Sequence, residues 1–202
     1  MDASEWDERY STAELIWTAE ANQFVAAETE HLPPGRALDL AAGEGRNAIW
    51  LAQRGWTVTA VDFSQVALDK GRHLAEHLDL GDNLQWICAD ARTWTPTPDS
   101  YDLIVVAYLH LPGVDLHAAI THAACGLSAG GTIVIVGHDL ANLDGGTGGP
   151  QDPAVLYTPQ LLNDIVLHAG LQATKASTVE RRTSNGVALD TLLTATPQAV
   201  EI

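Results

Sequence analysis

Apolar residues recur at two spacings along this chain, every second position in some stretches and every third or fourth in others. The first spacing predicts β-strands and the second predicts amphipathic helices. Five predicted strands alternate with helices, an order typical of a parallel sheet that is covered by helices on both faces. The strands are predicted at 37–40, 57–61, 84–89, 101–107 and 132–136, and the helices at 22–30, 46–55, 65–79, 115–127 and 158–168.

The end of the chain has a different pattern, because two strand-like stretches follow each other with no helix between them. Residues 171–182 and 187–195 are joined by Asn185-Gly186, a strong signal for a type I′ hairpin turn. These two strands are therefore predicted to be antiparallel. The predicted fold is a Rossmann-like, doubly wound, seven-stranded α/β sheet with an antiparallel C-terminal hairpin, and residues 1–202 are predicted to form a single domain.

A short glycine turn joins the first predicted strand to its helix. Gly43 and Gly45 let a ligand approach the backbone closely, and Gly43-x-Gly45-x-x-Ala48 fits the dinucleotide fingerprint. Asp39 lies at the strand end and Glu44 lies between the glycines, and both carboxylates would repel a pyrophosphate. A cationic ligand without phosphate, such as S-adenosylmethionine, would be attracted instead, since one charge pair at about 4 Å contributes roughly 4 kcal/mol at an intermediate dielectric.

The same turn resembles motif I of the class I S-adenosylmethionine-dependent methyltransferases, whose usual form is D/E-x-G-x-G-x-G. The matching string is Asp39-Leu40-Ala41-Ala42-Gly43-Glu44-Gly45, in which Ala41 takes the place of the first glycine. With Gly45-Arg46-Asn47 included, the string is similar to the tellurite-resistance and thiopurine methyltransferase group, and the resemblance covers most of the chain. It implies that the cofactor is bound by Asp39, Ala41, Gly43, Gly45 and Asn47.

Aromatic residues gather in an N-terminal segment, residues 1–21. Trp6 and Tyr10 are four positions apart and share one face of a predicted helix, and Trp17 follows them. The resemblance implies that these aromatics form a lid over the cofactor, where a ring near a sulfonium gains about 0.5–2 kcal/mol of cation–π attraction. The alternative is that they only pack onto the hydrophobic core.

Two acidic residues follow the next predicted strands. Asp62 comes directly after the second strand, where an acid can accept hydrogen bonds from both ribose hydroxyls in methyltransferases and dehydrogenases alike. Its alternative role is to cap the next helix, although Ser64 can do this instead. Phe63 is placed to stack on the adenine. The resemblance implies that Asp90 and the backbone of Ala91 contact the adenine, and the alternative for Asp90 is a turn acid.

The carboxyl ends of the central strands are where α/β sheets bind their ligands. Ala107 ends the fourth predicted strand beside the expected cofactor, and Tyr108 and His110 follow it toward the acceptor. His110 is the best candidate for a general base by its location and by the ordinary pKa of histidine, and the alternative is a residue that only lines the pocket. His138 follows the fifth strand as a second pocket residue. An N-P-P-Y-type motif for amine acceptors is absent, so methylation of an amide or base nitrogen loses support.

Arg181 and Arg182 are adjacent in a chain that is poor in positive charge. The resemblance implies that such a pair lies near the substrate, where one arginine could orient an anionic acceptor, and the alternative is an exposed strand end. Alternation along a strand sends the two side chains to opposite faces, so at most one should point inward. Residues 140–157 are rich in glycine and are predicted to form a flexible flap on the substrate side, and the alternative is a plain flexible loop.

Composition argues against several other functions. The formal net charge is −16, from 26 acidic residues against 10 Lys plus Arg, so we expect no nucleic-acid partner. No apolar run approaches about 18 residues, which predicts no membrane span, and no secretory signal is visible. Cys88 and Cys125 are expected to be buried and lack a metal-ligand spacing. These features predict a cytoplasmic protein without a metal site.

Together these observations predict S-adenosylmethionine-dependent methyl transfer to a small molecule by a monomer or homodimer. The donor carbon is already activated, so the protein mainly has to align the reactants and exclude water. A soft acceptor, such as a thiol or a chalcogen compound, would need no general base. Two alternatives stay open, namely an NAD(P)-dependent oxidoreductase that uses the same glycine turn and a non-catalytic S-adenosylmethionine binder.

Overall fold

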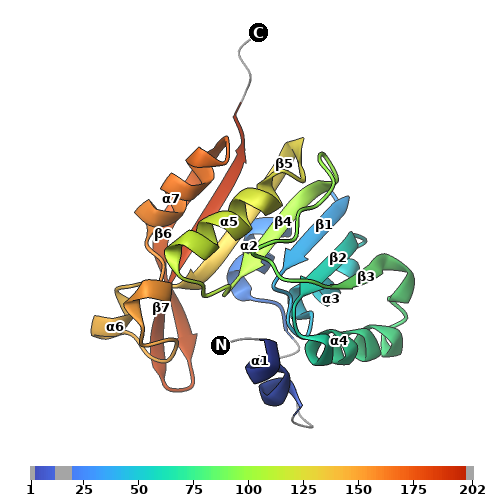
Figure 1. Cartoon of the computed structure of the whole chain (residues 1–202), viewed down its shortest axis with the longest axis horizontal. Helices are drawn as coiled ribbons and strands as arrows, with labels where there is room; N and C mark the ends of the chain where they lie inside the picture. Colours follow the sequence, from blue (N-terminus) through green and yellow to red (C-terminus); the bar gives the residue numbers. More distant parts are fainter. Residues whose placement is uncertain (1–2, 12–19, 199–202) are drawn as a thin grey trace.

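The computed structural model describes residues 3–11 and 20–198 of the chain. Its strands are β1 (Arg36–Leu40), β2 (Thr57–Asp62), β3 (Leu84–Cys88), β4 (Tyr101–Ala107), β5 (Leu127–His138), β6 (Leu171–Thr183) and β7 (Gly186–Pro197). They form a seven-stranded sheet in the order β3-β2-β1-β4-β5-β7-β6 (Figure 1). β1 to β5 are parallel, whereas β7 runs antiparallel to both β5 and β6. The predicted doubly wound sheet with an antiparallel C-terminal hairpin is confirmed.

Helices cover both faces of the sheet (Figure 1). They are α1 (Ala3–Tyr10), α2 (Gln23–Thr29), α3 (Arg46–Ala52), α4 (Gln65–His77), α5 (Gly113–Ala124), α6 (Asn142–Gly145) and α7 (Pro159–His168), with short 3-10 turns η1 (Gly81–Asn83) and η2 (Pro153–Val155). α5 and α7 pack their apolar side chains against one face. α2, α3 and α4 supply the core of the opposite face.

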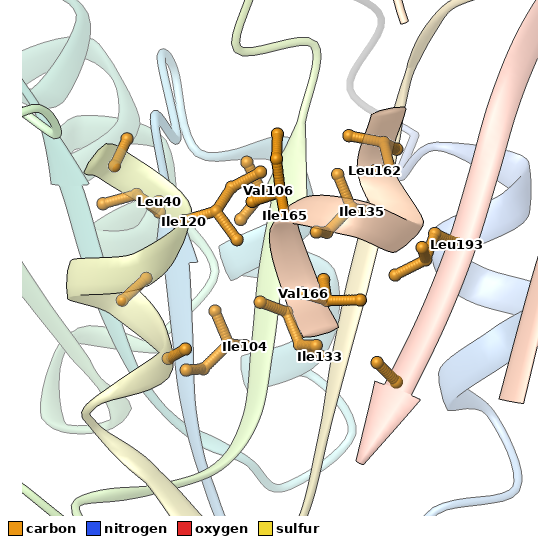
Figure 2. Close-up of a cluster of buried hydrophobic side chains, with 14 of the residues drawn as sticks. Leu40, Ile104, Val106, Ile120, Ile133, Ile135, Leu162, Ile165, Val166 and Leu193 are labelled. Carbon is orange, nitrogen blue, oxygen red and sulfur yellow. The ribbon is translucent and has the colours of Figure 1, made fainter. Parts of the chain in front are cut away.

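Side chains alternate between the two faces along each central strand, as the period of a β-strand requires. Ile104 and Val106 of β4 point toward α5 and α7 and are fully buried there (Figure 2). Their neighbours Leu103 and Val105 join the core of the other face. Both faces of β4 are therefore dry, which explains why its sequence is a nearly continuous apolar run.

The largest difference from the predicted elements lies at the start of β5. The helix predicted to reach Leu127 ends at Ala124, and Leu127 instead pairs with Tyr101 at an irregular position of the ladder. The chain leaves the helix at Gly126, where it passes so close to Pro96 that a Cβ would lie 2.5 Å from the proline ring. Only glycine fits there without a collision. The close approach of these two segments therefore overrides the apolar helical pattern of residues 125–127.

The expectation of buried cysteines is wrong, because Cys88 and Cys125 are both exposed free thiols. Each lies where an element ends: Cys88 is the last residue of β3, and Cys125 is the C-cap residue of α5. An apolar pattern read from sequence includes such end residues, although the backbone is leaving the packed layer there.

The strand order identifies the edge at which a ligand would bind. The chain winds from β1 toward β3 on one side and from β4 toward β7 on the other, so β1 and β4 flank the topological switch point. Ligands of open α/β sheets bind outside the carboxyl ends of the strands at this point. Figure 1 shows α1, α6 and the turn of the β6–β7 hairpin on that same side of the sheet.

A glycine inside α4 is required by packing rather than by backbone conformation. A Cβ at Gly71 would lie 2.6 Å from the Trp86 ring and 2.7 Å from the backbone oxygen of Glu44. Gly71→Ala should therefore lower the free energy of unfolding by roughly 1–3 kcal/mol, although alanine normally favours a helix. Urea denaturation measures the change.

Gly81→Ala is the matched control, because a Cβ at Gly81 would meet no atom within 4 Å. It should change the free energy of unfolding by less than about 0.5 kcal/mol. A Gly71→Ala protein as stable as the control would contradict the packing argument.

Candidate functional site

The loop after β1 forms a cradle of left-handed backbone. Ala41, Gly43 and Gly45 have φ angles of 60°, 56° and 78°. Ala41 thus adopts the geometry for which the first motif glycine is usually needed, although a side chain makes this conformation less favourable. Gly45 caps α3, and a Cβ there would collide with the ring of Trp86. The left-handed backbone therefore leaves one side of the cradle accessible, and the Trp86 ring fills the space on the other side.

Asp39 is buried beneath the cradle at the end of β1. Its Oδ2 accepts a hydrogen bond from the Ala48 N–H at 3.0 Å, whereas its Oδ1 is enclosed and has no partner. Burial raises the pKa of Asp39 to about 7, against the opposing effects of the Ala48 N–H and the charge of Arg46. A buried carboxylate with one free oxygen suits a site that binds a cationic or hydrogen-bond-donating ligand.

Asp62, the last residue of β2, joins the cradle to the start of α4. Its Oδ2 accepts from the Gly43 N–H at 2.8 Å and its Oδ1 from the Ser64 N–H at 2.9 Å. Burial raises the pKa of Asp62, and these N–H groups oppose the shift. Ser64 caps α4 by accepting from the Ala67 N–H, so Asp62 is not the cap. Each Asp62 oxygen keeps a further lone pair, and contact with a ribose remains a prediction.

Only one of the two carboxylates predicted to make the cradle negative, that of Asp39, lies in it. Glu44 points away toward α4, where it forms an ion pair with Lys70 at 3.1 Å, and its side chain is only 4% exposed. Arg46 lies close enough to Asp39 to lower the pKa of that carboxyl. The cradle therefore presents carboxylates at Asp39 and Asp62 together with one guanidinium, a mixed field rather than a negative one.

The residues predicted for the adenine are only partly brought together. Asp90 is held by Arg92, whose Nε lies 3.0 Å and whose Nη2 lies 2.6 Å from the carboxylate oxygens. This hydrogen-bonded contact lowers the pKa of Asp90. Ala91 is buried, and Phe63 is half-buried after β2. Adenine contacts by Phe63, Asp90 and Ala91 remain predictions, and the carboxylate of Asp90 is already engaged.

The predicted N-terminal lid is present in part as α1. Trp6 and Tyr10 stack with ring centroids 5.4 Å apart, which confirms that they share a helix face. The hydroxyl of Ser64 donates to the carboxylate of Asp7 at 2.5 Å and ties α1 to the start of α4, next to the cradle. Trp17 lies outside the described residues. A lid over the cofactor therefore remains a prediction that the position of α1 favours.

A second group of polar residues is centred on Asp190, which sequence reasoning missed. Asp190 lies on β7 and is fully buried. It accepts hydrogen bonds from the Tyr108 hydroxyl at 2.7 Å and from Arg181 Nε at 2.6 Å. His138 Nδ1 lies 3.2 Å from Asp190 Oδ1. Burial alone would raise the pKa of Asp190, but these partners hold it below its usual value. The sequence signal that could have identified Asp190 is an acidic residue within an otherwise apolar strand.

The two adjacent arginines point to opposite faces of β6, as alternation predicted. Arg181 is half-buried against Asp190, whereas Arg182 is exposed on the other face. Substrate binding by Arg182 remains a prediction, and its exposed position away from Asp190 does not favour it. Arg181 is already paired with Asp190, and its guanidinium lies 5.5 Å from the Tyr108 ring centroid. It thus belongs to the cluster around Asp190, and contact with a substrate remains a prediction.

His110 lies in the cluster, but its environment does not suit a base. Its Nδ1 is 2.9 Å from the Val155 carbonyl, which only accepts, so Nδ1 carries the proton. Its Nε2 is enclosed without a partner. Burial lowers the pKa of His110 to about 4, with the nearby His138 adding to the shift and the Val155 carbonyl opposing it. His110 is thus neutral at pH 7 and a weak base.

The segment 140–157 closes one side of the cluster. Val155 contacts His110 as described, and a Cβ at Gly149 would lie 2.8 Å from the His138 ring. The Asn142 side chain donates to the Gly148 carbonyl and accepts from the Leu189 N–H, each at 2.8 Å. The segment is thus anchored to both the cluster and β7. Its predicted flexibility remains a prediction.

Asn22 connects the cradle to the cluster, and sequence reasoning missed it too. Its N–H donates to Asn47 Oδ1 at 2.9 Å, and its Nδ2 donates to the Tyr108 hydroxyl at 3.1 Å. Its Oδ1 caps α2 by accepting from the N–H groups of Phe24 and Val25. Asn47 thus supports the cradle through Asn22. Ala107 ends β4 directly before Tyr108, so the hydrogen bond from Asn22 to Tyr108 brings the cofactor and acceptor candidates to one edge.

Known proteins resemble the cradle part of the chain in sequence. Residues 37–131 match a family described as a methyltransferase domain. Trans-aconitate 2-methyltransferase of Streptomyces avermitilis is 38% identical over 114 residues, covering 53% of this chain and 41% of that protein. tRNA 5-carboxymethoxyuridine methyltransferase of Escherichia coli (strain K12) is 40% identical over 73 residues, covering 35% and 27%. The chain spans less than half the length of the curated relatives it matches. Residues 37–131 thus resemble methyltransferase domains in sequence.

Solved structures extend the likeness to nearly the whole fold. One, reported for the conversion of a disulfide bond into a thioacetal group during echinomycin biosynthesis, has a TM-score of 0.77 at 21% identity and covers 98% of this chain and 93% of its own. Magnesium protoporphyrin IX methyltransferase of Synechocystis PCC 6803, with bound S-adenosylhomocysteine, has a TM-score of 0.69 at 17% identity and covers 96% and 94%. These identities show a shared fold. A place in the tellurite-resistance and thiopurine group remains a prediction.

The residues that the structure describes contain neither a candidate membrane-spanning helix nor a candidate metal-binding group of side chains. No helix there is long and apolar enough to cross a membrane. No group of three or more His, Cys, Asp or Glu side chains within residues 3–11 and 20–198 could hold a metal ion.

The raised pKa of Asp39 predicts a pH-dependent stability. An unfolded Asp has a pKa of about 4, so between about pH 4 and pH 7 the folded state keeps a proton that the unfolded state has released. The free energy of unfolding therefore falls as pH rises through this window. Relative to the wild type, Asp39→Asn should gain on the order of 1–3 kcal/mol between pH 5 and pH 8, measured by urea denaturation.

Asp82→Asn, on the exposed η1 turn, is the control for this experiment and should show no such gain. A stability difference between Asp39→Asn and the wild type that stays constant from pH 5 to pH 8 would contradict the raised pKa.

The two arginines provide a matched pair for testing the buried carboxylate. Arg181→Ala leaves Asp190 without its cationic partner and should cost roughly 2–4 kcal/mol of unfolding free energy at neutral pH. Arg182→Ala removes an exposed side chain and should cost less than about 0.5 kcal/mol. Equal losses in urea denaturation would show that the Arg181–Asp190 pair does not stabilise the fold.

Proposed function

We propose that this protein transfers the methyl group of S-adenosylmethionine to a small-molecule acceptor. The observation that supports this most directly is the arrangement of two sites at one edge of the sheet. The cradle after β1 lies in the segment that matches methyltransferase domains. The buried cluster around Asp190 lies beside it, and Asn22 joins the two by hydrogen bonds. A methyltransferase needs such a pair of adjoining sites to align donor and acceptor.

The residues of the cradle fit S-adenosylmethionine. The left-handed backbone at Ala41, Gly43 and Gly45 allows close approach of a ligand, and Asp62 has lone pairs for ribose hydroxyls. Asp39 has an enclosed oxygen without a donor. When bound, the cofactor supplies a methyl group that its sulfonium already activates. The chain itself orients the reactants and excludes water, with α1 as a cover on the cradle side.

The proposed acceptor nucleophile is a thiol or a chalcogen compound. His110 is a weak base, since its pKa is lowered to about 4. Burial, with help from Asp190, raises the pKa of Tyr108 above its usual range, so its hydroxyl stays protonated. A thiol loses its proton more readily than a phenol or an alcohol does, so it makes the smallest demand on a base in such a site. The substrates named for the two curated relatives are an organic acid and a tRNA, and the net charge of −16 argues against the second for this chain.

The proposed setting is the cytoplasm. Cys88 and Cys125 are exposed free thiols, which persist best in a reducing compartment. A thiol or selenol acceptor would be stable in the same compartment. The proposed assembly is a monomer or a homodimer.

Cofactor binding tests the cradle directly. Calorimetry at neutral pH should show binding of S-adenosylmethionine and S-adenosylhomocysteine and no binding of NADH. Asp62→Ala removes the carboxylate that accepts from the Gly43 and Ser64 N–H groups, and it should weaken binding roughly 10–100-fold. Asp82→Ala on the exposed η1 turn should bind like the wild type. Tight binding of NADH without either sulfur compound would refute the proposal in favour of an oxidoreductase.

Release of S-adenosylhomocysteine with a panel of acceptors tests the acceptor class. Small thiols and selenols should be methylated, whereas phenols, amines and nucleic acid should not. Turnover on a carboxylic acid alone would replace the thiol assignment by that of the organic-acid relative. Tight cofactor binding with no turnover on any acceptor would favour a non-catalytic binder.

A further inference from the structure

We infer that His138, oriented by Asp190, is the general base that takes the proton from the acceptor nucleophile. The inference rests on the proposed methyl transfer and assigns a catalytic residue to its acceptor side. His138 is the last residue of β5, the strand next to β4 on the side away from the cradle. Its imidazole therefore lies beyond the switch point, where an acceptor rather than the cofactor would bind.

The contact with Asp190 selects one tautomer of the imidazole. Nδ1 of His138 lies 3.2 Å from Asp190 Oδ1. An ionised carboxylate only accepts, so Nδ1 carries the ring proton and Nε2 keeps its lone pair. The contact lies within ion-pair distance but outside aligned hydrogen-bond geometry, and catalytic hydrogen bonds commonly tighten only when the substrate binds. Asp190 is thus a positioning residue, and Nε2 is the atom that meets the acceptor.

Two histidines of the cluster share this tautomer, but only one presents its lone pair to a ligand. The centroids of the His110 and His138 rings lie 5.3 Å apart. The Nε2 of His110 is enclosed by protein atoms. In His138 the nitrogen enclosed in this way is Nδ1 and not Nε2, and the side chain keeps 14% of its surface exposed. His138 therefore replaces His110 as the residue that can reach a substrate.

The charges around His138 keep Asp190 ionised. Arg181 and the Tyr108 hydroxyl donate to Asp190 Oδ2, and together with His138 they hold its pKa below the usual value despite burial. An ionised carboxylate behind an imidazole stabilises the imidazolium that forms on proton transfer. The neighbouring His110 is neutral at pH 7, so it adds no opposing charge.

The proposed step is balanced in atoms and charge. Nε2 of His138 accepts the proton of the acceptor thiol, leaving a lone pair and a negative charge on the acceptor sulfur. That lone pair forms the new sulfur–carbon bond to the methyl group, while the carbon–sulfur bond of the donor breaks and its electron pair stays on the donor sulfur. The products are a methyl thioether and the neutral demethylated donor. The imidazolium then returns its proton to water.

Nitrogen NMR of the wild-type protein tests the tautomer without any turnover. The chain has eight histidines, so the His138 signals are assigned from the spectrum of His138→Gln. In 15N-histidine-labelled protein at pH 8, His138 should show a protonated Nδ1 and a bare Nε2. A protonated Nε2 would overturn the inference whatever the protein methylates.

Two thiols that differ in acidity test the base function. The probes are 2-mercaptoethanol, which is mostly protonated at pH 7, and 4-nitrothiophenol, which is already ionised there. His138→Gln should lower kcat/KM for 2-mercaptoethanol by about 10²–10⁴-fold. It should change the value for 4-nitrothiophenol by less than about tenfold, because no proton needs to be removed from that acceptor.

Equal losses with both thiols would show a structural role for His138 and overturn the inference. If the wild type binds S-adenosylmethionine but methylates neither thiol, the acceptor class proposed above is wrong, and the NMR result alone decides the tautomer of His138. The failure of the two proposals is thus distinguishable.

Two neighbouring glycines offer a test that leaves every polar residue in place. Gly148 and Gly149 have φ angles of 74° and 80°, so an alanine is strained similarly at either position. A Cβ at Gly149 would lie 2.8 Å from the His138 ring, whereas one at Gly148 would meet nothing within 4 Å. Gly149→Ala should displace the imidazole and reduce turnover of 2-mercaptoethanol more than tenfold relative to Gly148→Ala. Equal activities of the two variants would contradict the placement of the base.

Discussion

The site depends on the compensation of one buried negative charge. Asp190 is fully buried on β7, and a carboxylate in that position is tolerated only when several donors surround it. The groups that surround it come from three strands or their ends: Tyr108 follows β4, His138 ends β5 and Arg181 lies on β6. Tyr108 has a φ of 59°, a conformation that costs about 1–3 kcal/mol in a residue other than glycine. The need to compensate the charge of Asp190 thus outweighs the backbone preference of Tyr108.

The sheet could be predicted from the sequence because its signals are local. The apolar run of β4 and the Asn185-Gly186 turn each specify an element from neighbouring residues, and the structure contains both elements. The cradle was equally accessible, since the left-handed backbone at Ala41 follows from its place in the glycine motif. Element ends were less accessible. Leu127 begins a strand rather than ending a helix because of contacts with a segment about 25 residues earlier.

The polar partners could not be predicted, because they are set by contacts between distant segments. The position of Glu44 between two glycines predicts that it faces a ligand. In the structure Lys70 on α4 binds it on the other side of the cradle. Asp190 lies 82 positions from Tyr108, and Asn22 lies 86 positions from the same tyrosine. Periodicity shows which face of a strand a residue occupies, but it does not show which side chain from a distant segment contacts that residue. The choice between His110 and His138 as base depends on which ring nitrogen is enclosed, which is a tertiary property.

Trp86 gives the last glycine of the cradle motif a second meaning. Its ring occupies the space in which side chains at Gly45 and Gly71 would lie. Both glycines are therefore coupled to the size of residue 86, independently of any bound molecule. A homologue could lose its enzymatic role and still retain glycine at position 45, or acquire a larger residue there together with a smaller one at position 86. Glycine at position 45 therefore reflects the space that the Trp86 ring occupies as well as any need to bind a ligand. Co-substitution at positions 45 and 86 would distinguish these two causes.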